Sequence, residues 1–178
     1  SNIAMVCPDL AERTVVVNGV SKAYAMTGWR IGYAAGPANV IGAMKKIQSQ
    51  STSNASSISQ AASVAALNGD QGVIGPMVKA FRERHDFVVK RLNAMKGVSC
   101  IAGDGTFYAF PDVSGAIAAI DGVDTDTALA EHLIAEANVA LVPGTAFGAP
   151  GHARISFATS MENLEKAMDR LEGAFGRG

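Results

Sequence analysis

The chain has 178 residues, enough for one large domain or two small domains with a buried core. Its composition, 48% hydrophobic and 17% charged residues, is that of a globular protein and excludes a disordered tail. Its apolar runs are too short for a membrane-spanning helix. The net charge of −1 argues against nucleic acid or an anionic membrane surface as a partner.

Cys7 and Cys100 have neither the spacing of a metal site nor that of a redox pair. Because free thiols suit a reducing compartment, we expect a cytoplasmic protein. The chain begins with SNIAMVCPDL, without an initiator methionine or a secretory signal. Its first two residues are therefore expected either to be left from cloning or to lie partway into a longer protein.

The first part of the chain predicts two short strands followed by helices. RTVVVNG at 13–19 is rich in β-branched residues and ends in Asn-Gly, which predicts a buried strand and a turn, and RIGYAAG at 30–36 predicts a second strand. Pro37 begins a helix with apolar side chains at helical spacing, namely Val40, Ile41, Met44 and Ile47. A hydroxyl-rich segment at 49–57 breaks this helix, and a buried helix of small residues is expected at about 55–67.

The second part predicts a long helix and then a compact α/β lobe, with a boundary near residue 97. The long helix carries one apolar stripe, formed by Ile74, Met77, Phe81, His85, Val88, Leu92 and Met95. Beyond it, the pattern predicts strands at 97–103, 106–113, 139–144 and 153–158, and helices at 125–138 and after Ser160. Thr125 is the expected N-cap and Asn138 the expected end of the first of these helices.

Lys22 and Arg30 stand in the nearly uncharged run VNGVSKAYAMTGWRIGYAAG, on the turn between the two expected strands. A charged side chain among small and apolar residues needs a partner or a chemical role. A single loop lysine is usually only solvated, and Arg154 in the apolar strand ARISFA is, taken alone, as consistent with a structural ion pair as with ligand binding. Function therefore has to be argued from the whole pattern.

The pattern Gly19-Val20-Ser21-Lys22, followed by Gly28-Trp29-Arg30-Ile31-Gly32, resembles the cofactor-lysine signature of the class I aminotransferases. These are pyridoxal-phosphate enzymes of fold type I, and the bacterial aspartate and prephenate aminotransferases are the most similar group. The segments GTFYAFPD, LVPGTAFG and ARISFA extend the resemblance over nearly the whole chain. It implies the C-terminal part of an α/β fold: the end of the large cofactor domain at 1–72, an interdomain helix at 73–97 and a small α/β domain at 98–178.

The resemblance also implies roles for four residues. Lys22 would condense with the aldehyde of pyridoxal 5′-phosphate and then transfer protons as a base. Arg30 would bind the cofactor phosphate, with a hydroxyl donor from Ser21, although Gly19 stands where some members have a serine. Arg154 would bind the substrate α-carboxylate through two parallel hydrogen bonds.

Ser53 and Asn54 resemble residues that the family places near the cofactor of the neighbouring subunit, although a helix cap is the simpler interpretation. Packing is likewise the simpler interpretation of Tyr24 and Trp29, and His85 is expected in the core because it lies on the apolar stripe. The histidines show no metal-ligand spacing. The segment IQSQSTSN lacks the arginine that some aspartate aminotransferases place before this Ser-Asn, so a distal carboxylate would be bound elsewhere.

The implied function is the transfer of an amino group between L-aspartate, or a related amino acid, and 2-oxoglutarate, by a homodimer in the intact enzyme. The resemblance covers only the C-terminal part of such an enzyme, so this chain is expected to be inactive alone. Two alternatives stay open from the sequence. One is a non-catalytic ligand-binding domain of a regulator, and the other is a pyridoxal-phosphate-dependent lyase.

Overall fold

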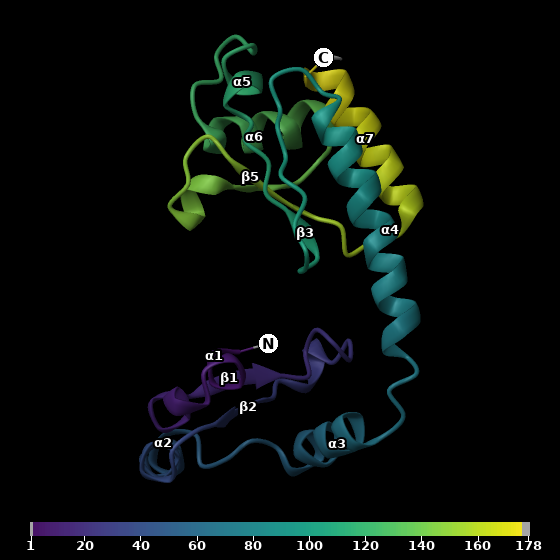
Figure 1. The fold of residues 1–178 in the computed structure, drawn as a ribbon. Coiled ribbons are helices and arrows are strands. Elements are labelled where there is room, and N and C mark those ends of the chain that lie inside the picture. Colours follow the sequence, from purple (N-terminus) through teal and green to yellow (C-terminus); the bar gives the residue numbers. More distant parts are fainter. Residues whose placement is uncertain (1, 176–178) are drawn as a thin grey trace. The chain divides into compact units, whose positions relative to one another are not determined.

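The computed structural model describes residues 2–175, and the chain divides into two compact units, Ser1–Pro76 (unit 1) and Met77–Gly178 (unit 2). None of the helices within residues 2–175 is long and apolar enough to cross a membrane. In chain order, unit 1 contains α1 (Ile3–Val6), the 3-10 helix η1 (Pro8–Arg13), β1 (Val16–Gly19), η2 (Thr27–Trp29), β2 (Gly32–Ala35), α2 (Ala38–Ser51) and α3 (Ser57–Asn68) (Figure 1).

Strands β1 and β2 of unit 1 form a two-stranded antiparallel sheet, with Val16 opposite Ala35 and Gly19 opposite Gly32. The two strands expected here are thus confirmed, with shorter bounds. The expectation that the first is buried is wrong, because the Val17 side chain is 76% exposed. A two-stranded sheet has two faces, and the described part of unit 1 does not cover the face that carries Val17.

Helix α2 begins directly after Pro37, as predicted, and the break before α3 is limited to residues 52–56. No residue of α2 is buried, and α3 buries only Ser59 and Ser63. The expected burial of α3 is therefore wrong, since Ile58 and Val64 are exposed. Small side chains allow another element to approach closely, but they bury a helix only where such an element is present.

Unit 2 begins within the long helix α4 (Ile74–Asn93) and contains a three-stranded antiparallel sheet with three further helices. Its elements after α4 are β3 (Tyr108–Ala109), α5 (Ser114–Ile117), α6 (Asp126–Ala137), β4 (Val142–Pro143), the 3-10 helix η3 (Gly144–Phe147), β5 (Ala153–Ser156) and α7 (Met161–Phe175). The strand order is β3-β5-β4, with Tyr108 opposite Ser156 and Val142 opposite Arg154.

The predicted helices of unit 2 are confirmed, and their ends are those the sequence indicated. The Thr125 side chain accepts a hydrogen bond from the Ala128 N–H at 3.1 Å, and Asn138 ends α6 with a left-handed φ of 52°. The Ser160 hydroxyl accepts from the Asn163 N–H at 3.2 Å at the start of α7. These caps use only side chains and backbone groups within one turn, so the local sequence suffices to predict them.

The strands of unit 2 are shorter than expected, and segment 97–103 is not a strand. It makes only an isolated bridge between Ser99 and Asp112. The Asn93 side chain forms hydrogen bonds with both backbone groups of Cys100, which in a strand would bond to a neighbouring strand. It donates to the Cys100 carbonyl at 2.9 Å and accepts from the Cys100 N–H at 2.8 Å. A side-chain amide from the end of α4 thus replaces sheet hydrogen bonds.

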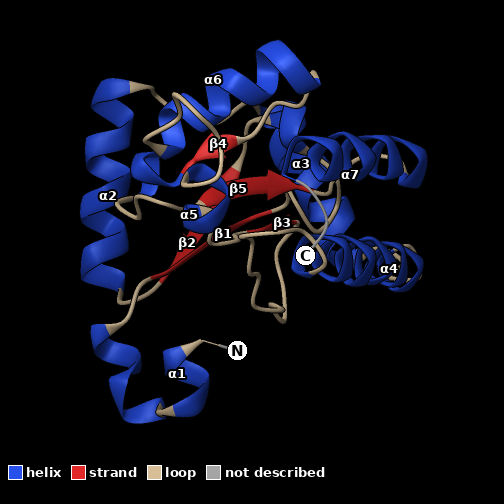
Figure 2. Ribbon diagram, turned by 90° about the horizontal axis from the view of Figure 1, so that it is seen from above, coloured by secondary structure: helices blue, strands red, loops and turns tan. Residues whose placement is uncertain are grey.

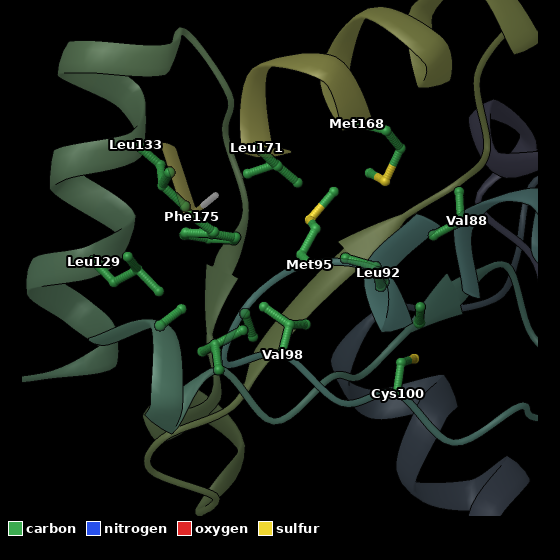
Figure 3. Close-up of a cluster of buried hydrophobic side chains, with 14 of the residues drawn as sticks. Val88, Leu92, Met95, Val98, Cys100, Leu129, Leu133, Met168, Leu171 and Phe175 are labelled. Atoms are coloured by element: carbon green, nitrogen blue, oxygen red, sulfur yellow. The ribbon is translucent and has the colours of Figure 1, made fainter. Parts of the chain in front are cut away.

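The hydrophobic core of unit 2 lies between α4, α6, α7 and the sheet. In Figure 3, Leu129 and Leu133 from α6 point toward Leu171 and Phe175 from α7, and Val88 and Leu92 from α4 complete the cluster. Helices α4 and α7 run side by side (Figures 1 and 2). Arg91 on α4 bridges them through ion pairs with Asp169 at 2.7 Å and Glu172 at 2.8 Å.

Candidate active site

In unit 1, a single loop connects β1 to β2 and carries Ser21, Lys22 and Arg30. The loop begins at Val20, which is only 1% exposed, whereas Lys22 and Arg30 are exposed. Backbone hydrogen bonds shape the turn: the Met26 N–H donates to the Ser21 carbonyl at 3.0 Å, and the Ala25 N–H donates to the Lys22 carbonyl at 3.2 Å. A buried anchor and a hydrogen-bonded turn therefore present the lysine side chain at the surface of this unit.

Arg30 has an unusual backbone conformation, with φ 49° and ψ 52° in the left-handed region. Its Nη1 donates to the Thr27 carbonyl at 3.0 Å, so the guanidinium folds back over the 3-10 turn of its own loop. Ala25 in the same loop also has a positive φ, of 53°. A left-handed conformation costs a residue with a Cβ about 1–2 kcal/mol, and such strain is concentrated at functional sites.

Two hydrogen bonds tie the loop to the helical part of unit 1. The Tyr24 hydroxyl donates to Gln71 Oε1 at 2.8 Å, and the Ser59 hydroxyl on α3 donates to the Trp29 carbonyl at 2.8 Å. Tyr24 and the Trp29 backbone thus have structural contacts. The Trp29 ring is 42% exposed, so the expected packing of this ring is not seen within unit 1.

Ser53 and Asn54 lie in the connection between α2 and α3, and neither caps a helix. The residue after α2 in the C-cap position is Thr52, and the N-cap position of α3 is Ser56. The cap interpretation of Ser53 and Asn54 is therefore wrong. Ser53 instead adopts a positive φ of 65°, and the Asn54 N–H donates to the Thr52 carbonyl at 2.9 Å. Their expected position near a neighbouring subunit's cofactor stays a prediction.

In unit 2, Arg154 lies on β5, the central strand of the sheet, and is half-buried. Its Cζ is 4.6 Å from the ring centroid of Phe147 and 5.3 Å from that of Tyr108. No acidic side chain within residues 2–175 forms an ion pair with Arg154. This argues against the structural ion-pair interpretation and leaves the guanidinium donors available for the carboxylate of a ligand.

The aromatic rings around Arg154 were not singled out from the sequence. Phe110 packs edge-on against Phe147 with 6.0 Å between ring centroids, and it stacks on His152 at 5.3 Å. The sequence signal for this cluster is a spacing of two residues, between Tyr108 and Phe110 and between His152 and Arg154. Residues two apart in an extended chain lie on the same face of the sheet.

Asp126 at the start of α6 was also missed, and it fixes the position of η3. Its side chain accepts a hydrogen bond from the Thr145 N–H at 2.6 Å and one from the Thr145 hydroxyl at 2.8 Å. Burial acts to raise the pKa of Asp126, but these hydrogen bonds, together with backbone donors at the helix start, lower the pKa below the usual 3.8. The carboxylate is therefore charged at neutral pH and holds η3, the element that carries Phe147, against α6.

His85 on α4 is partly buried at the edge of the core, with a side chain that is 12% exposed, so the core position expected from the apolar stripe is met only in part. Its ring packs edge-on against Phe157 with 5.8 Å between ring centroids. Its Nδ1 is 2.9 Å from Asp86, and its Nε2 accepts from the Gly103 N–H at 3.2 Å. These contacts give His85 a structural role in positioning segment 101–106.

The structure thus brings Ser21, Lys22 and Arg30 together on one loop of unit 1 and places Arg154 in unit 2. The loop residues fit a phosphorylated aldehyde cofactor: Lys22 supplies a primary amine, Arg30 a planar set of donors for phosphate and Ser21 a hydroxyl. Arg154 fits a carboxylate. Together with the mixed α/β fold, these residues define the class of enzymes that use pyridoxal 5′-phosphate to act on amino acids.

The chain belongs to the family of class I and II aminotransferases, whose model matches residues 2–171. The aspartate/prephenate aminotransferase of Nitrosomonas europaea is 54% identical over 96% of this chain and 44% of its own length. The aspartate aminotransferase of Rhizobium meliloti is 49% identical over 96% of this chain and 42% of its own length. The family and the cofactor class expected from the sequence are thereby confirmed.

A solved structure shows the same fold. The crystal structure of the aspartate aminotransferase from Rhizobium meliloti matches with a TM-score of 0.93 and 48% identity, over 99% of this chain and 45% of that chain. The expected fold class, part of a pyridoxal-phosphate-dependent transferase fold, is confirmed. This chain spans less than half the length of the relatives it matches.

Proposed function

We propose that this chain is part of an aminotransferase that transfers an amino group between L-aspartate, or a related amino acid, and 2-oxoglutarate. Relatives named aspartate or aspartate/prephenate aminotransferase, with identities from 46% to 54%, support this reaction. They favour it over a lyase and over the non-catalytic domain of a regulator. Because the chain spans less than half of these relatives, the activity is proposed for the longer protein and not for the chain alone.

The observation that carries the proposal is the loop with Lys22 and Arg30. When bound, pyridoxal 5′-phosphate supplies an aldehyde that reacts with amines and a ring that stabilises negative charge at the substrate Cα. Lys22 Nζ would hold the cofactor through its primary amine, and the same amine would act as the base that moves the proton at the substrate Cα. Arg30 would hold the cofactor phosphate with its guanidinium donors, and the Ser21 hydroxyl would supply a further donor.

Arg154 binds the substrate α-carboxylate and so orients the Cα–H bond for proton removal. In this proposal residues 1–72 complete the large cofactor domain, 73–97 form the interdomain helix and 98–178 form the small α/β domain. The longer enzyme acts as a homodimer in the cytoplasm, with an amino acid and a 2-oxo acid as substrates. Their carboxylates are the chemical feature that Arg154 recognises.

The proposal is tested on the full-length enzyme with Lys22→Arg, which keeps the positive charge but removes the primary amine. Loss of the proton-transferring base predicts a fall in kcat of at least about 100-fold. Borohydride treatment followed by digestion and mass spectrometry should place the cofactor label on the wild-type peptide that contains Lys22. Lys46→Arg on α2 is the matched control and should keep both activity and label. A label on another peptide, or one that persists in Lys22→Arg, contradicts the lysine assignment.

A further inference from the structure

We propose that Phe147 is a positioning residue for Arg154: its ring fixes the plane of the guanidinium and thus the direction from which a substrate carboxylate binds. The inference deepens the proposed function and rests on it, because it takes Arg154 as the carboxylate ligand. It concerns a side chain on η3 that makes no covalent contribution to the reaction.

The first step of the argument is the geometry of the contact. The Cζ of Arg154 lies 4.6 Å from the Phe147 ring centroid, within the range of about 6 Å at which a guanidinium is attracted to an aromatic ring. Tyr108 adds a second ring at 5.3 Å. A ring over the face of a guanidinium leaves its N–H groups free, because these donors lie in the guanidinium plane. A contact through the ring face would therefore orient the guanidinium without using any of its carboxylate-binding donors.

The second step is that no acidic residue within residues 2–175 orients the Arg154 guanidinium. Within residues 2–175 Arg154 has no ion-pair partner, whereas Arg91 of the same unit is held by Asp169 and Glu172. A carboxylate partner would compete with the substrate carboxylate for the same donors. An aromatic ring orients the arginine before the substrate arrives, and this lowers the entropy that is lost on binding.

The third step is that Phe147 is held in place although the hydrophobic core does not need it. Its side chain is 47% exposed and is not part of the buried cluster. The backbone that carries it is fixed at the start of η3, where Thr145 is bound by Asp126 and the Gly144 N–H donates to the His152 carbonyl at 2.7 Å. Phe110 supports the ring from the side with a 6.0 Å edge-on contact. Within residues 2–175, packing against the core therefore does not explain this exposed ring, whereas contact with Arg154 does.

The test uses the full-length holoenzyme and compares Phe147→Leu, which keeps apolar volume, with Phe147→Tyr, which keeps the ring. From the usual strength of a cation–π contact, Phe147→Leu should raise the KM for L-aspartate and the calorimetric Kd for succinate, an unreactive dicarboxylate, about 3- to 30-fold. The absorbance spectrum of the bound cofactor should stay as in the wild type, because Phe147 is not assigned to cofactor binding. Phe147→Tyr should restore wild-type KM and Kd. Phe87→Leu, which removes the ring 5.7 Å from Arg91, is the matched control and should leave both constants unchanged.

Arg154→Ala separates this inference from the proposed function. If Arg154→Ala does not weaken succinate binding, the assignment of the carboxylate ligand fails. If Arg154→Ala weakens binding but Phe147→Leu does not, only the positioning role of Phe147 is overturned. Equal losses in Phe147→Leu and Phe147→Tyr also overturn it. Should Phe147→Leu fail to fold, Phe147→His tests the same point, because its flat but electron-poorer ring must raise the Kd above that of Phe147→Tyr.

Discussion

Three charged side chains of this protein are accommodated in three different ways. Lys22 is exposed on a hydrogen-bonded turn, and half-buried Arg154 lies against the rings of Phe147 and Tyr108. Asp126 is 3% exposed, and its two oxygens accept hydrogen bonds from Thr145. Asp126 is thus satisfied by the chain's own polar groups, as a buried charge requires. Arg154 has no ion-pair partner within residues 2–175 and so retains donors for a carboxylate ligand.

Asp126→Asn should destabilise the protein because it replaces a buried carboxylate that accepts two hydrogen bonds. We expect the free energy of unfolding at pH 7 to fall by about 2 kcal/mol, the usual magnitude for a hydrogen bond to a charged group, as measured by urea denaturation. The exposed neighbour Asp124→Asn is the control and should have little effect.

The same substitution gives a pH dependence with a defined sign. The pKa of Asp126 is lowered in the folded protein, so its stabilising contribution is present above the unfolded value of about 3.8 and is lost as the pH falls through the folded pKa. The difference in unfolding free energy between the wild type and Asp126→Asn should therefore shrink at acid pH. A difference that grows on acidification would contradict the proposed hydrogen bonding.

At the scale of elements, η3 depends on a glycine at its first position. A Cβ added to Gly144 would lie 2.2 Å from the Ala149 carbonyl oxygen and 2.7 Å from the His152 carbonyl oxygen, and neither backbone group can move freely. The segment LVPG was expected to continue as a strand to residue 144, but the chain turns into η3 after Pro143. The close approach at Gly144 permits this turn, which brings Phe147 over Arg154.

Gly144→Ala should consequently lower the free energy of unfolding by at least about 2 kcal/mol, as overpacking against backbone does. Thermal or urea unfolding measures this effect. Gly173→Ala on α7 is the control: a Cβ there meets nothing within 4 Å, and alanine favours the helix, so stability should stay equal or rise by up to about 1 kcal/mol. Similar losses for both variants would contradict the packing argument.

At the scale of the whole molecule, the buried apolar side chains are concentrated in one unit. Within residues 2–175, Val20 is the only buried hydrophobic residue of unit 1, whereas unit 2 has a continuous core across α4, α6, α7 and the sheet. In unit 1 the apolar side chains of α2 and α3 are largely exposed, among them Ile47 and Ile58. Since burial of apolar area is the main stabilising contribution, the two units should differ strongly in stability.

Hydrogen exchange followed by mass spectrometry on this chain tests that difference. Peptides from α2 and α3 should exchange rapidly, because little buried area opposes local opening, whereas peptides from α6 and α7 should be protected much longer. The central part of α4 around Val88 and Leu92 should behave like α7. Equal protection in both units would contradict the argument from buried apolar area.

The sequence by itself determined the family, the loop residues Lys22 and Arg30, and the helices α6 and α7 with their caps. These features are local: a motif spacing, a helical periodicity or a cap involves residues a few positions apart, so a single sequence contains the whole signal. For the same reason the positions of β1 and β2, on either side of the loop with Lys22 and Arg30, could be predicted, although their lengths could not.

Only the tertiary structure decided which helices are buried, which groups form hydrogen bonds with segment 97–103, and which side chains surround Arg154. Each of these depends on residues distant in sequence: Asn93 replaces strand bonding at Cys100, and Asp126 fixes the element that brings Phe147 to Arg154. Whether an apolar stripe is covered depends on an element elsewhere in the chain, and local periodicity carries no information about that element. The sequence therefore contains the motif and the local elements, whereas long-range packing determines which side chains surround Arg154.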